Sequence, residues 1–472
     1  MVFSSIIFIL FFLPAFLIAY YIAPRIIKNY VLLVFSLVFY AWGAPSFILF
    51  LVPSTLINYF LVSLMNNSKG LKAKIYLSLN VSVNLGLLFY FKYANFFLEN
   101  VNYIRDWIQV PAVEWNPIIL PIGISFFTFQ SITYSMDVYR KIHLPLKNPF
   151  NYMLYIMMFP QMIAGPIVRF IDIADQISAR KEKWEDFLYG FNRFALGLAK
   201  KVLIADVLGK EVDRIMAMDY ALLDSSTAWV GIVGYTFQLY FDFSGYSDMA
   251  IGIGRMIGFK FPENFNNPYV ARSVTEFWRR WHITFSVFMK NYLYYPLGGS
   301  RVATNRRLYF NLWFIFLISG LWHGASWNFV IYGAFHGFFL VLERIFLLKW
   351  LEKVGVIPSV LFTFFIIVMA RVFFRIEELD QAVLYFKSLF SFNFKTLVLV
   401  GKEHFYVMMA IATFFSFITL SKTGLWLQDI FYTRNYNAAG HIAMWILSIA
   451  LGILSISSLT GFGYSPFIYF RF

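Results

Sequence analysis

The stretch FSSIIFILFFLPAFLIAYYIA, residues 3–23, decides the class of this protein. It is close to the roughly 20 apolar residues that a helix needs to cross a hydrocarbon core, and similar runs recur along the whole chain. The runs do not alternate between apolar and polar residues, as the strands of a membrane barrel would. No basic segment precedes the first run and no small-residue cleavage site follows it, so we expect a retained helix. The sequence predicts an all-α polytopic membrane protein, with residues 1–472 forming one integral membrane domain.

The composition agrees with this class. Hydrophobic residues make up 60% of the chain and charged residues 14%, whereas soluble proteins carry about a quarter charged residues. The net charge of +14 does not indicate a nucleic-acid partner, because the lysines and arginines lie in short loops between apolar runs. The chain has no cysteine, which excludes disulfides, thiolate metal sites and a thiol acyl carrier.

Basic loops predict the orientation of the first half. Residues 24–28, 66–74 and 140–147 are basic and are expected in the cytoplasm, which places the N-terminus outside. Residues 94–116 are expected to form a polar, aromatic external stretch. The other membrane runs are expected near residues 30–50, 53–65, 75–91, 117–139, 188–208, 226–252, 307–325, 327–348, 357–374, 404–421 and 440–460. Together with interrupted segments they give about eleven to thirteen membrane or re-entrant helices, and the orientation after residue 150 stays open.

One apolar run is interrupted. Residues 152–168 contain Pro160, Gly165 and Pro166, and residues 169–187 after them read as an amphipathic segment. An interrupted helix would leave backbone groups unpaired in lipid, so such segments line a protected cavity.

The first polar stretch inside an apolar run is QLYFDFSGYSDMAIGIG, residues 238–254. Helical spacing puts Asp242 on one face with Tyr246, and Ser244 with Asp248. Buried aspartates are costly and usually face a cavity or the interior of a bundle. The structural alternative is a hydrogen-bond network that fixes helix packing, and the sequence does not decide between the two. Three glycines would let a second helix approach closely: Gly245, Gly252 and Gly254.

The second polar stretch is TEFWRRWHITFS, residues 275–286. Glu276 and Arg280 are four residues apart and are expected to pair, with Arg279 also within reach. Two tryptophans suit the interfacial level of a bilayer: Trp278 and Trp281. His282 has no such explanation, and on this stretch alone an amphipathic interfacial helix is the favoured interpretation.

The third polar stretch, residues 317–340, contains two histidines in apolar surroundings. His323 and His336 are each followed by glycine, and their spacing puts them on different faces of a continuous helix. We expect His323 to be the functional one and His336 to pack or orient. No compact ligand spacing such as HExxH occurs, so we expect no metal. What remains is acid–base chemistry by a neutral imidazole, which can deprotonate an alcohol as it attacks an acyl carbon. Direct transfer and a serine ester both stay open.

Several long stretches carry a resemblance to a known family. They are VFSSIIFILFFLP (2–14), LPIGISFFTFQSITYSMDVYR (120–140), FPQMIAGPIVRF (159–170), YFDFSGYSDMAIGIGRMIGF (240–259), FWRRWHITFS (277–286), GLWHGASWNFVIYGAFHG (320–337) and FIYFRF (467–472). Together they resemble the membrane-bound O-acyltransferases, in particular the bacterial branch that O-acetylates exopolysaccharides such as alginate, or peptidoglycan. The core motifs lie within residues 117–345.

The resemblance implies a ring of tilted helices around a central tunnel. His323, in the WHG motif, would be the catalytic base, and His282 would face it across the tunnel. Further substrate or tunnel candidates are Asp242, Ser244, Tyr246, Asp248, Glu276, Arg279, Trp322 and His336. The acyl donor would be cytoplasmic acetyl-CoA, with no permanently bound cofactor. A periplasmic O-acetyltransferase partner would complete transfer to a polysaccharide acceptor, and the enzyme would lie in the bacterial cytoplasmic (inner) membrane among its lipids.

Two other functions stay open at this point. One is a D-alanyl transferase for teichoic acid that uses an acyl carrier protein as donor. The other is a proton-coupled transporter in which the buried aspartates and histidines form a proton relay.

Overall fold

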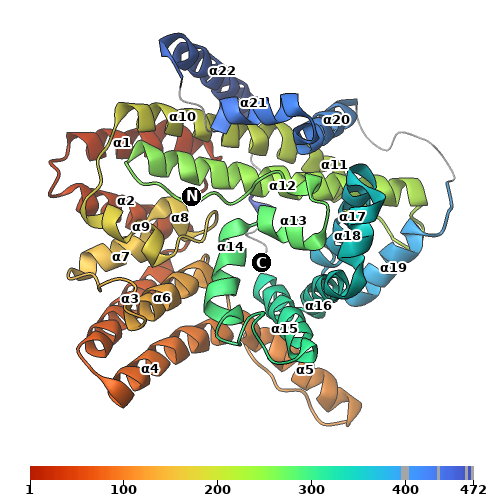
Figure 1. Ribbon diagram of the computed structural model, residues 1–472, viewed down its shortest axis with the longest axis horizontal. Coiled ribbons are helices and arrows are strands. Elements are labelled where there is room, and N and C mark those ends of the chain that lie inside the picture. Colours follow the sequence, from red (N-terminus) through yellow and green to blue (C-terminus); the bar gives the residue numbers. More distant parts are fainter. Residues whose placement is uncertain (395–402, 433–435, 463–465, 469–472) are drawn as a thin grey trace. The chain divides into compact units, whose positions relative to one another are not determined.

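The structure is a computed structural model that describes residues 1–394, 403–432, 436–462 and 466–468 (Figure 1). The last four residues of the FIYFRF stretch therefore lie outside the described part. Within the described residues every regular element is a helix, apart from one isolated bridge between Phe265 and Trp281. This confirms the all-α class.

The chain forms two compact units. Unit 1 comprises Met1–Lys183 and Ile257–Pro262, and unit 2 comprises Trp184–Met256 and Glu263–Phe472. The expectation of a single membrane domain stays a prediction.

Unit 1 consists of apolar helices and one interrupted segment. After a π-helical turn at Phe8–Phe12, its helices are α1 (Leu13–Ile22), α2 (Lys28–Gly43), α3 (Pro45–Asn66), α4 (Gly70–Leu88), α5 (Ala94–Trp107), α6 (Ile124–Tyr139), α7 (Pro149–Met157), α8 (Phe159–Met162) and α9 (Phe170–Ser178).

One helix boundary in unit 1 differs from the predicted one. The break expected between residues 50 and 53 lies at Ala44, because Pro45 occupies the first turn of α3, where its missing N–H costs nothing. Pro53 lies inside α3 without ending it, as neighbouring groups in membrane helices allow. The expected external stretch 94–116 begins with helix α5. The interruption in 152–168 is confirmed: the helix ends at Met157 and the whole segment is buried.

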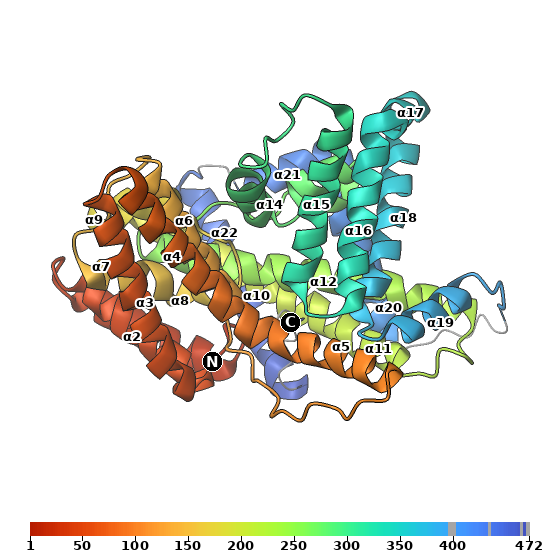
Figure 2. The same cartoon turned by 90° about the horizontal axis from the view of Figure 1, so that it is seen from below.

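Unit 2 contains all the candidate site residues. Its helices are α10 (Trp184–Ala199), α11 (Asp206–Met216), α12 (Ser225–Met256), α13 (Val274–Arg280), α14 (Ile283–Met289), α15 (Asn305–His323), α16 (Trp327–Leu342), α17 (Leu348–Val354), α18 (Val356–Arg375), α19 (Leu379–Leu389), α20 (Glu403–Phe417), α21 (Lys422–Tyr432) and α22 (Ala438–Phe462). A π-helical turn, Lys200–Ala205, joins α10 to α11. Helices α15 and α16 form an antiparallel pair (Figure 2).

Glycines let α10 and α12 pack backbone to backbone. Gly190 faces Gly252 and Gly197 faces Gly245, and a Cβ atom added at Gly197 would lie 2.5 Å from the carbonyl oxygen of Gly245. Figure 1 shows the two helices side by side. The predicted close approach is thus confirmed at Gly245 and Gly252.

Six segments of the described chain are long and apolar enough to cross a membrane: residues 45–66, 70–107, 327–354, 356–375, 403–420 and 438–461. Residues 8–22 and 28–43 form shorter apolar helices. The protein is therefore a multi-pass membrane protein. The expected count of eleven to thirteen also included the helices that carry polar motifs, such as α10, α12 and α15. That count and the ring around a tunnel stay predictions.

Candidate active site

His282 occupies the turn between α13 and α14, two helices of seven residues each, and is completely buried. Its backbone is left-handed, with φ 45° and ψ 54°, which costs a residue with a side chain roughly 1–3 kcal/mol. Asn264 fixes the ring, because its Oδ1 lies 3.0 Å from Nδ1. The carbonyl oxygen accepts, so Nδ1 carries the proton and Nε2 is the basic nitrogen. Burial lowers the pKa of His282 to about 3, which keeps the ring neutral.

His323 lies against the same aromatic rings as His282. It is the last residue of α15 and is 2% exposed. The Phe285 ring centroid lies 5.1 Å from that of His282 and 5.7 Å from that of His323. The Trp322 ring lies 5.9 Å from His282 and 4.8 Å from His323, and it stacks on Phe285 at 4.3 Å. The structure therefore brings the two predicted histidines to one stacked pair of rings.

His336 lies one aromatic ring away from His323. The Trp278 Nε1–H donates to His336 Nδ1 at 3.4 Å. The Tyr332 ring lies 4.7 Å from the His336 ring and 5.8 Å from the His323 ring. This geometry suits the packing or orienting role expected for His336, which stays a prediction.

Arg371 is a site residue that the sequence reasoning missed. It lies in α18, is 1% exposed, and places its guanidinium carbon 4.4 Å from the Trp281 ring centroid. Its Nη1 donates to the Tyr332 hydroxyl at 3.2 Å. Trp281 directly precedes His282 in the sequence. The centroid of the Phe374 ring lies 5.6 Å from the guanidinium carbon and 5.2 Å from the centroid of the His323 ring. The signal was available, because a charged residue inside an apolar run such as 357–374 is a functional candidate by default.

Both aspartates of α12 lie in ion pairs. Asp248 pairs with Arg193 at 2.8 Å and with Lys200 at 2.6 Å. Asp242 pairs with Lys201 at 2.7 Å. These contacts join α12 to α10 and to the π-helical turn after it, as the structural alternative expects. A contact of either aspartate with substrate stays a prediction.

The other α12 candidates, Ser244 and Tyr246, are both buried. The Tyr246 ring stacks on Phe467 with centroids 4.6 Å apart. The backbone N–H of Ile468 donates to Asp242 Oδ2 at 2.9 Å. Ser244 is 2% exposed. Phe467 and Ile468 therefore pack against the face of α12 that carries Asp242 and Tyr246.

In the stretch 275–286 the predicted ion pair is present, but the two tryptophans do not lie where they were predicted. Glu276 and Arg280 pair at 2.8 Å, as expected. Trp278 and Trp281 were expected at a bilayer interface, but they are 5% and 1% exposed and lie inside unit 2. The reason is that both indoles have partners there: Trp278 donates to His336, and Trp281 lies under a buried guanidinium.

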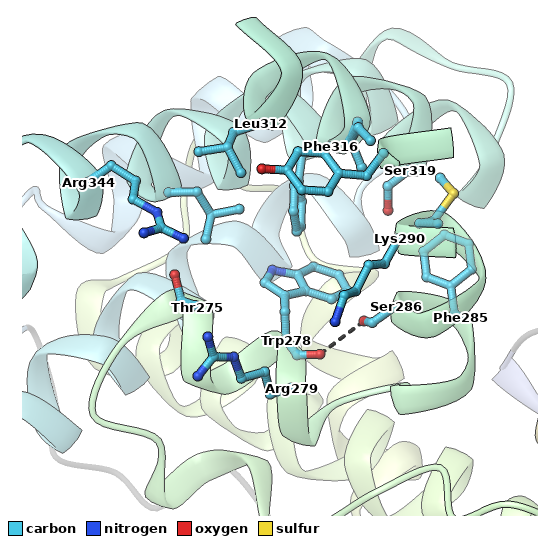
Figure 3. A pocket seen from close by; sticks show the side chains of 14 residues that line it. Thr275, Trp278, Arg279, Phe285, Ser286, Lys290, Leu312, Phe316, Ser319 and Arg344 are labelled. Carbon is cyan, nitrogen blue, oxygen red and sulfur yellow. Dashed lines mark hydrogen bonds between the residues drawn. The ribbon is translucent and has the colours of Figure 1, made fainter. Parts of the chain in front are cut away.

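A cavity of about 190 Å³ lies between α13, α14, α15 and α16 (Figure 3). Arg279, Lys290 and Arg344 line it, and no acidic side chain is among its described lining residues. Phe285, the ring shared by the two histidines, forms part of its wall. The cavity is thus a space with three cationic side chains in its lining, and the Phe285 ring in its wall also contacts the two histidines.

Glu343 ties α13 to the end of α16. Its carboxylate accepts from the backbone N–H groups of Val274 and Thr275, the latter at 2.9 Å, and from the Thr275 hydroxyl at 2.6 Å. These N–H groups belong to the first turn of α13 and have no partner within the helix. A buried carboxylate at a helix N-terminus is also favoured by the helix dipole. Glu343 thereby fixes the helix that leads into His282.

The described residues contain no group of three His, Asp or Glu side chains placed to hold a metal ion. The expectation of acid–base chemistry by histidine alone stays a prediction.

The family model described as MBOAT, membrane-bound O-acyltransferase family, matches residues 4–375. The chain belongs to the membrane-bound O-acyltransferase family. This acyltransferase is 39% identical to the probable alginate O-acetylase AlgI of Pseudomonas putida over the full length of both chains. It is 38% identical to the peptidoglycan O-acetyltransferase of Helicobacter pylori, over 85% of this chain and 82% of that one. The teichoic acid D-alanyltransferase of Bacillus subtilis is 29% identical over 50% of this chain and 62% of that one. The resemblance expected from the motifs is confirmed.

Proposed function

We propose that this acyltransferase transfers an acetyl group for the O-acetylation of a cell-envelope or secreted polysaccharide, either alginate-like or peptidoglycan. The O-acetylases among its relatives are similar over most or all of the chain, whereas the D-alanyltransferase is similar over half of it. This difference in coverage favours acetyl over D-alanyl transfer. The enzyme would act in the bacterial inner membrane, with a periplasmic O-acetyltransferase as partner.

The observation that carries the proposal is the pair His282 and His323 on the shared rings of Phe285 and Trp322. In the proposed reaction Nε2 of a neutral His323 accepts the proton of the attacking hydroxyl. The hydroxyl oxygen forms a bond to the thioester carbonyl carbon, the carbon–sulfur bond breaks, and the leaving thiolate takes up the proton. His282, fixed by Asn264, would lie on the other side of the reacting carbon and orient it.

The cationic cavity supports acetyl-CoA as the donor. Arg279, Lys290 and Arg344 suit the phosphate groups of such a donor, because guanidinium and ammonium groups bind phosphate through charge-assisted hydrogen bonds. A single side chain, Phe285, would then lie between the cavity and the histidine pair.

The test is the O-acetyl content of the polymer in a deletion strain that carries the wild-type gene or a variant. His323→Ala is expected to abolish O-acetylation and His282→Ala to reduce it strongly, at wild-type levels of inserted protein. His404→Ala removes an exposed histidine of α20 and is the matched control. Normal O-acetylation with His323→Ala would overturn the proposed mechanism. Transfer of D-alanine to teichoic acid, in place of acetyl transfer, would overturn the proposal that acetyl-CoA is the donor.

A further inference from the structure

Unit 1 contains a second polar cleft, of about 340 Å³, between the α1–α2 loop and the segment that follows α9. The described residues that line it include four cationic side chains and one acidic side chain. The cations are Arg25, Lys28, Arg180 and Lys181, and the acid is Glu182. The residues that line the cleft belong to unit 1, whereas the residues of the candidate acyl-transfer site belong to unit 2.

Two of the four cations are held in place by the protein. Arg180 donates from Nη1 to Asn29 Oδ1 at 2.6 Å and from Nη2 to the Tyr20 hydroxyl at 2.9 Å. Lys28 pairs with Glu182 at 3.2 Å and lies 4.8 Å from the Tyr20 ring centroid. The floor of the cleft is therefore ordered before any ligand arrives, which lowers the entropic cost of binding.

The other two cations have no acidic partner among the described residues. Arg25 and Lys181 are exposed and line the cleft without an ion pair. With Glu182 already bonded to Lys28, the cleft keeps a positive charge that no described side chain neutralises.

Exposed apolar side chains lie on both sides of Arg25 in the loop between α1 and α2. Ile22 and Ile26, on either side of Arg25 in the sequence, are 79% and 87% exposed. The loop joins two apolar helices and is one of the basic loops expected in the cytoplasm. With that topology the loop would lie where lipid headgroups meet acyl chains. The positive-inside rule accounts for basic residues in the loop, but it does not account for their gathering around an ordered cleft.

We propose that this cleft binds the phosphate of an anionic phospholipid. Arg25 and Lys181 would contact the phosphate, with Arg180 as the fixed floor, while the acyl chains follow the exposed isoleucines of the loop. Basic pockets on the cytoplasmic side of membrane helices bind anionic headgroups in this way. The protein then has a lipid site in addition to its acyl-transfer site.

The test is native mass spectrometry of the full chain in a neutral detergent, after incubation with phosphatidylcholine vesicles or with vesicles that also contain phosphatidylglycerol. The wild type is expected to retain phosphatidylglycerol and to release phosphatidylcholine. The double variant Arg25→Gln/Lys181→Gln is expected to bind phosphatidylglycerol about 25-fold more weakly, since each cation near the surface contributes about fivefold. Lys72→Gln/Lys74→Gln removes two exposed lysines near the start of α4 in the same unit and is the matched control, with affinity unchanged.

A variant of opposite sign separates binding from misfolding. Glu182→Gln removes the one acid among the described lining residues of the cleft and is expected to increase retention of phosphatidylglycerol, an outcome that a folding defect does not produce. Equal weakening by the Lys72/Lys74 control would show general charge attraction and overturn the proposal. Displacement of the lipid by inorganic phosphate at matched concentration would assign the cleft to a soluble anion instead. Retention that is unaffected by both Arg25→Gln/Lys181→Gln and Glu182→Gln would also overturn it.

Discussion

Replacing Asp248 with alanine is expected to destabilise unit 2 while leaving acetyl transfer intact in every molecule that folds. The Asp248 carboxylate is 6% exposed and pairs with Arg193 at 2.8 Å and Lys200 at 2.6 Å. At an effective dielectric constant of about 20, each pair at this separation attracts by about 6 kcal/mol. Desolvation opposes that attraction, and removing one partner of a buried pair costs about 3–5 kcal/mol. Arg193 keeps Glu263 as a partner, so the uncompensated charge is that of Lys200.

The assay heats the detergent-solubilised protein and measures the remaining folded fraction by size-exclusion chromatography, together with acetyl transfer per folded molecule. Asp186→Ala is the control, because Asp186 of α10 pairs with Arg255 of α12 at 2.8 Å and both side chains are partly exposed. Pairs of this kind contribute about 0–1 kcal/mol. If Asp248→Ala is as stable as Asp186→Ala, or folds normally and transfers no acetyl, the structural interpretation of Asp248 is refuted.

Three further variants test the packing around the site. Gly245→Val is expected to force α12 away from Gly197 on α10 and to reduce the folded yield. Gly452→Val is the control and should fold normally, because no neighbouring atom lies within 4 Å of the added Cβ. Equal folded yields of the two variants on size-exclusion chromatography would contradict this expectation. Arg371→Lys keeps the charge but loses the planar stack, so we expect kcat to fall roughly 10–100-fold at unchanged KM, and an unchanged kcat would count against a positioning role. Glu343→Ala leaves two N–H groups of α13 unpaired, at about 1–3 kcal/mol each, and a wild-type thermal midpoint would argue against that cost.

The long helices of unit 2 were predictable because hydrophobic runs fix them locally. The run 226–252 corresponds to α12 (Ser225–Met256), and the run 357–374 corresponds to α18 (Val356–Arg375). The break at Ala44 was not predictable from the runs, because a proline at a helix start and a proline tolerated inside a helix look alike in sequence.

The site was predictable only in part, because the side chains that contact its residues come from segments far away in the sequence. Sequence spacing identified the pair Glu276 and Arg280, four residues apart on one helix. It did not identify Arg193 as a partner of Asp248, because that contact joins residues 55 positions apart. Trp281 was misplaced for the same reason: an indole suits an interface, and only the fold shows that Arg371 lies over its ring.

The most direct test of the account is the initial rate of acetyl release from labelled acetyl-CoA by inverted membrane vesicles, which expose the cytoplasmic face. With His323→Ala the account predicts a rate equal to that of vesicles without the enzyme, while His404→Ala keeps the wild-type rate. In the proposed mechanism the histidine pair acts on the acyl carbon, so loss of His323 would remove the base even when the donor still binds. A wild-type rate with His323→Ala, in vesicles that contain the same amount of folded protein, would contradict the central claim.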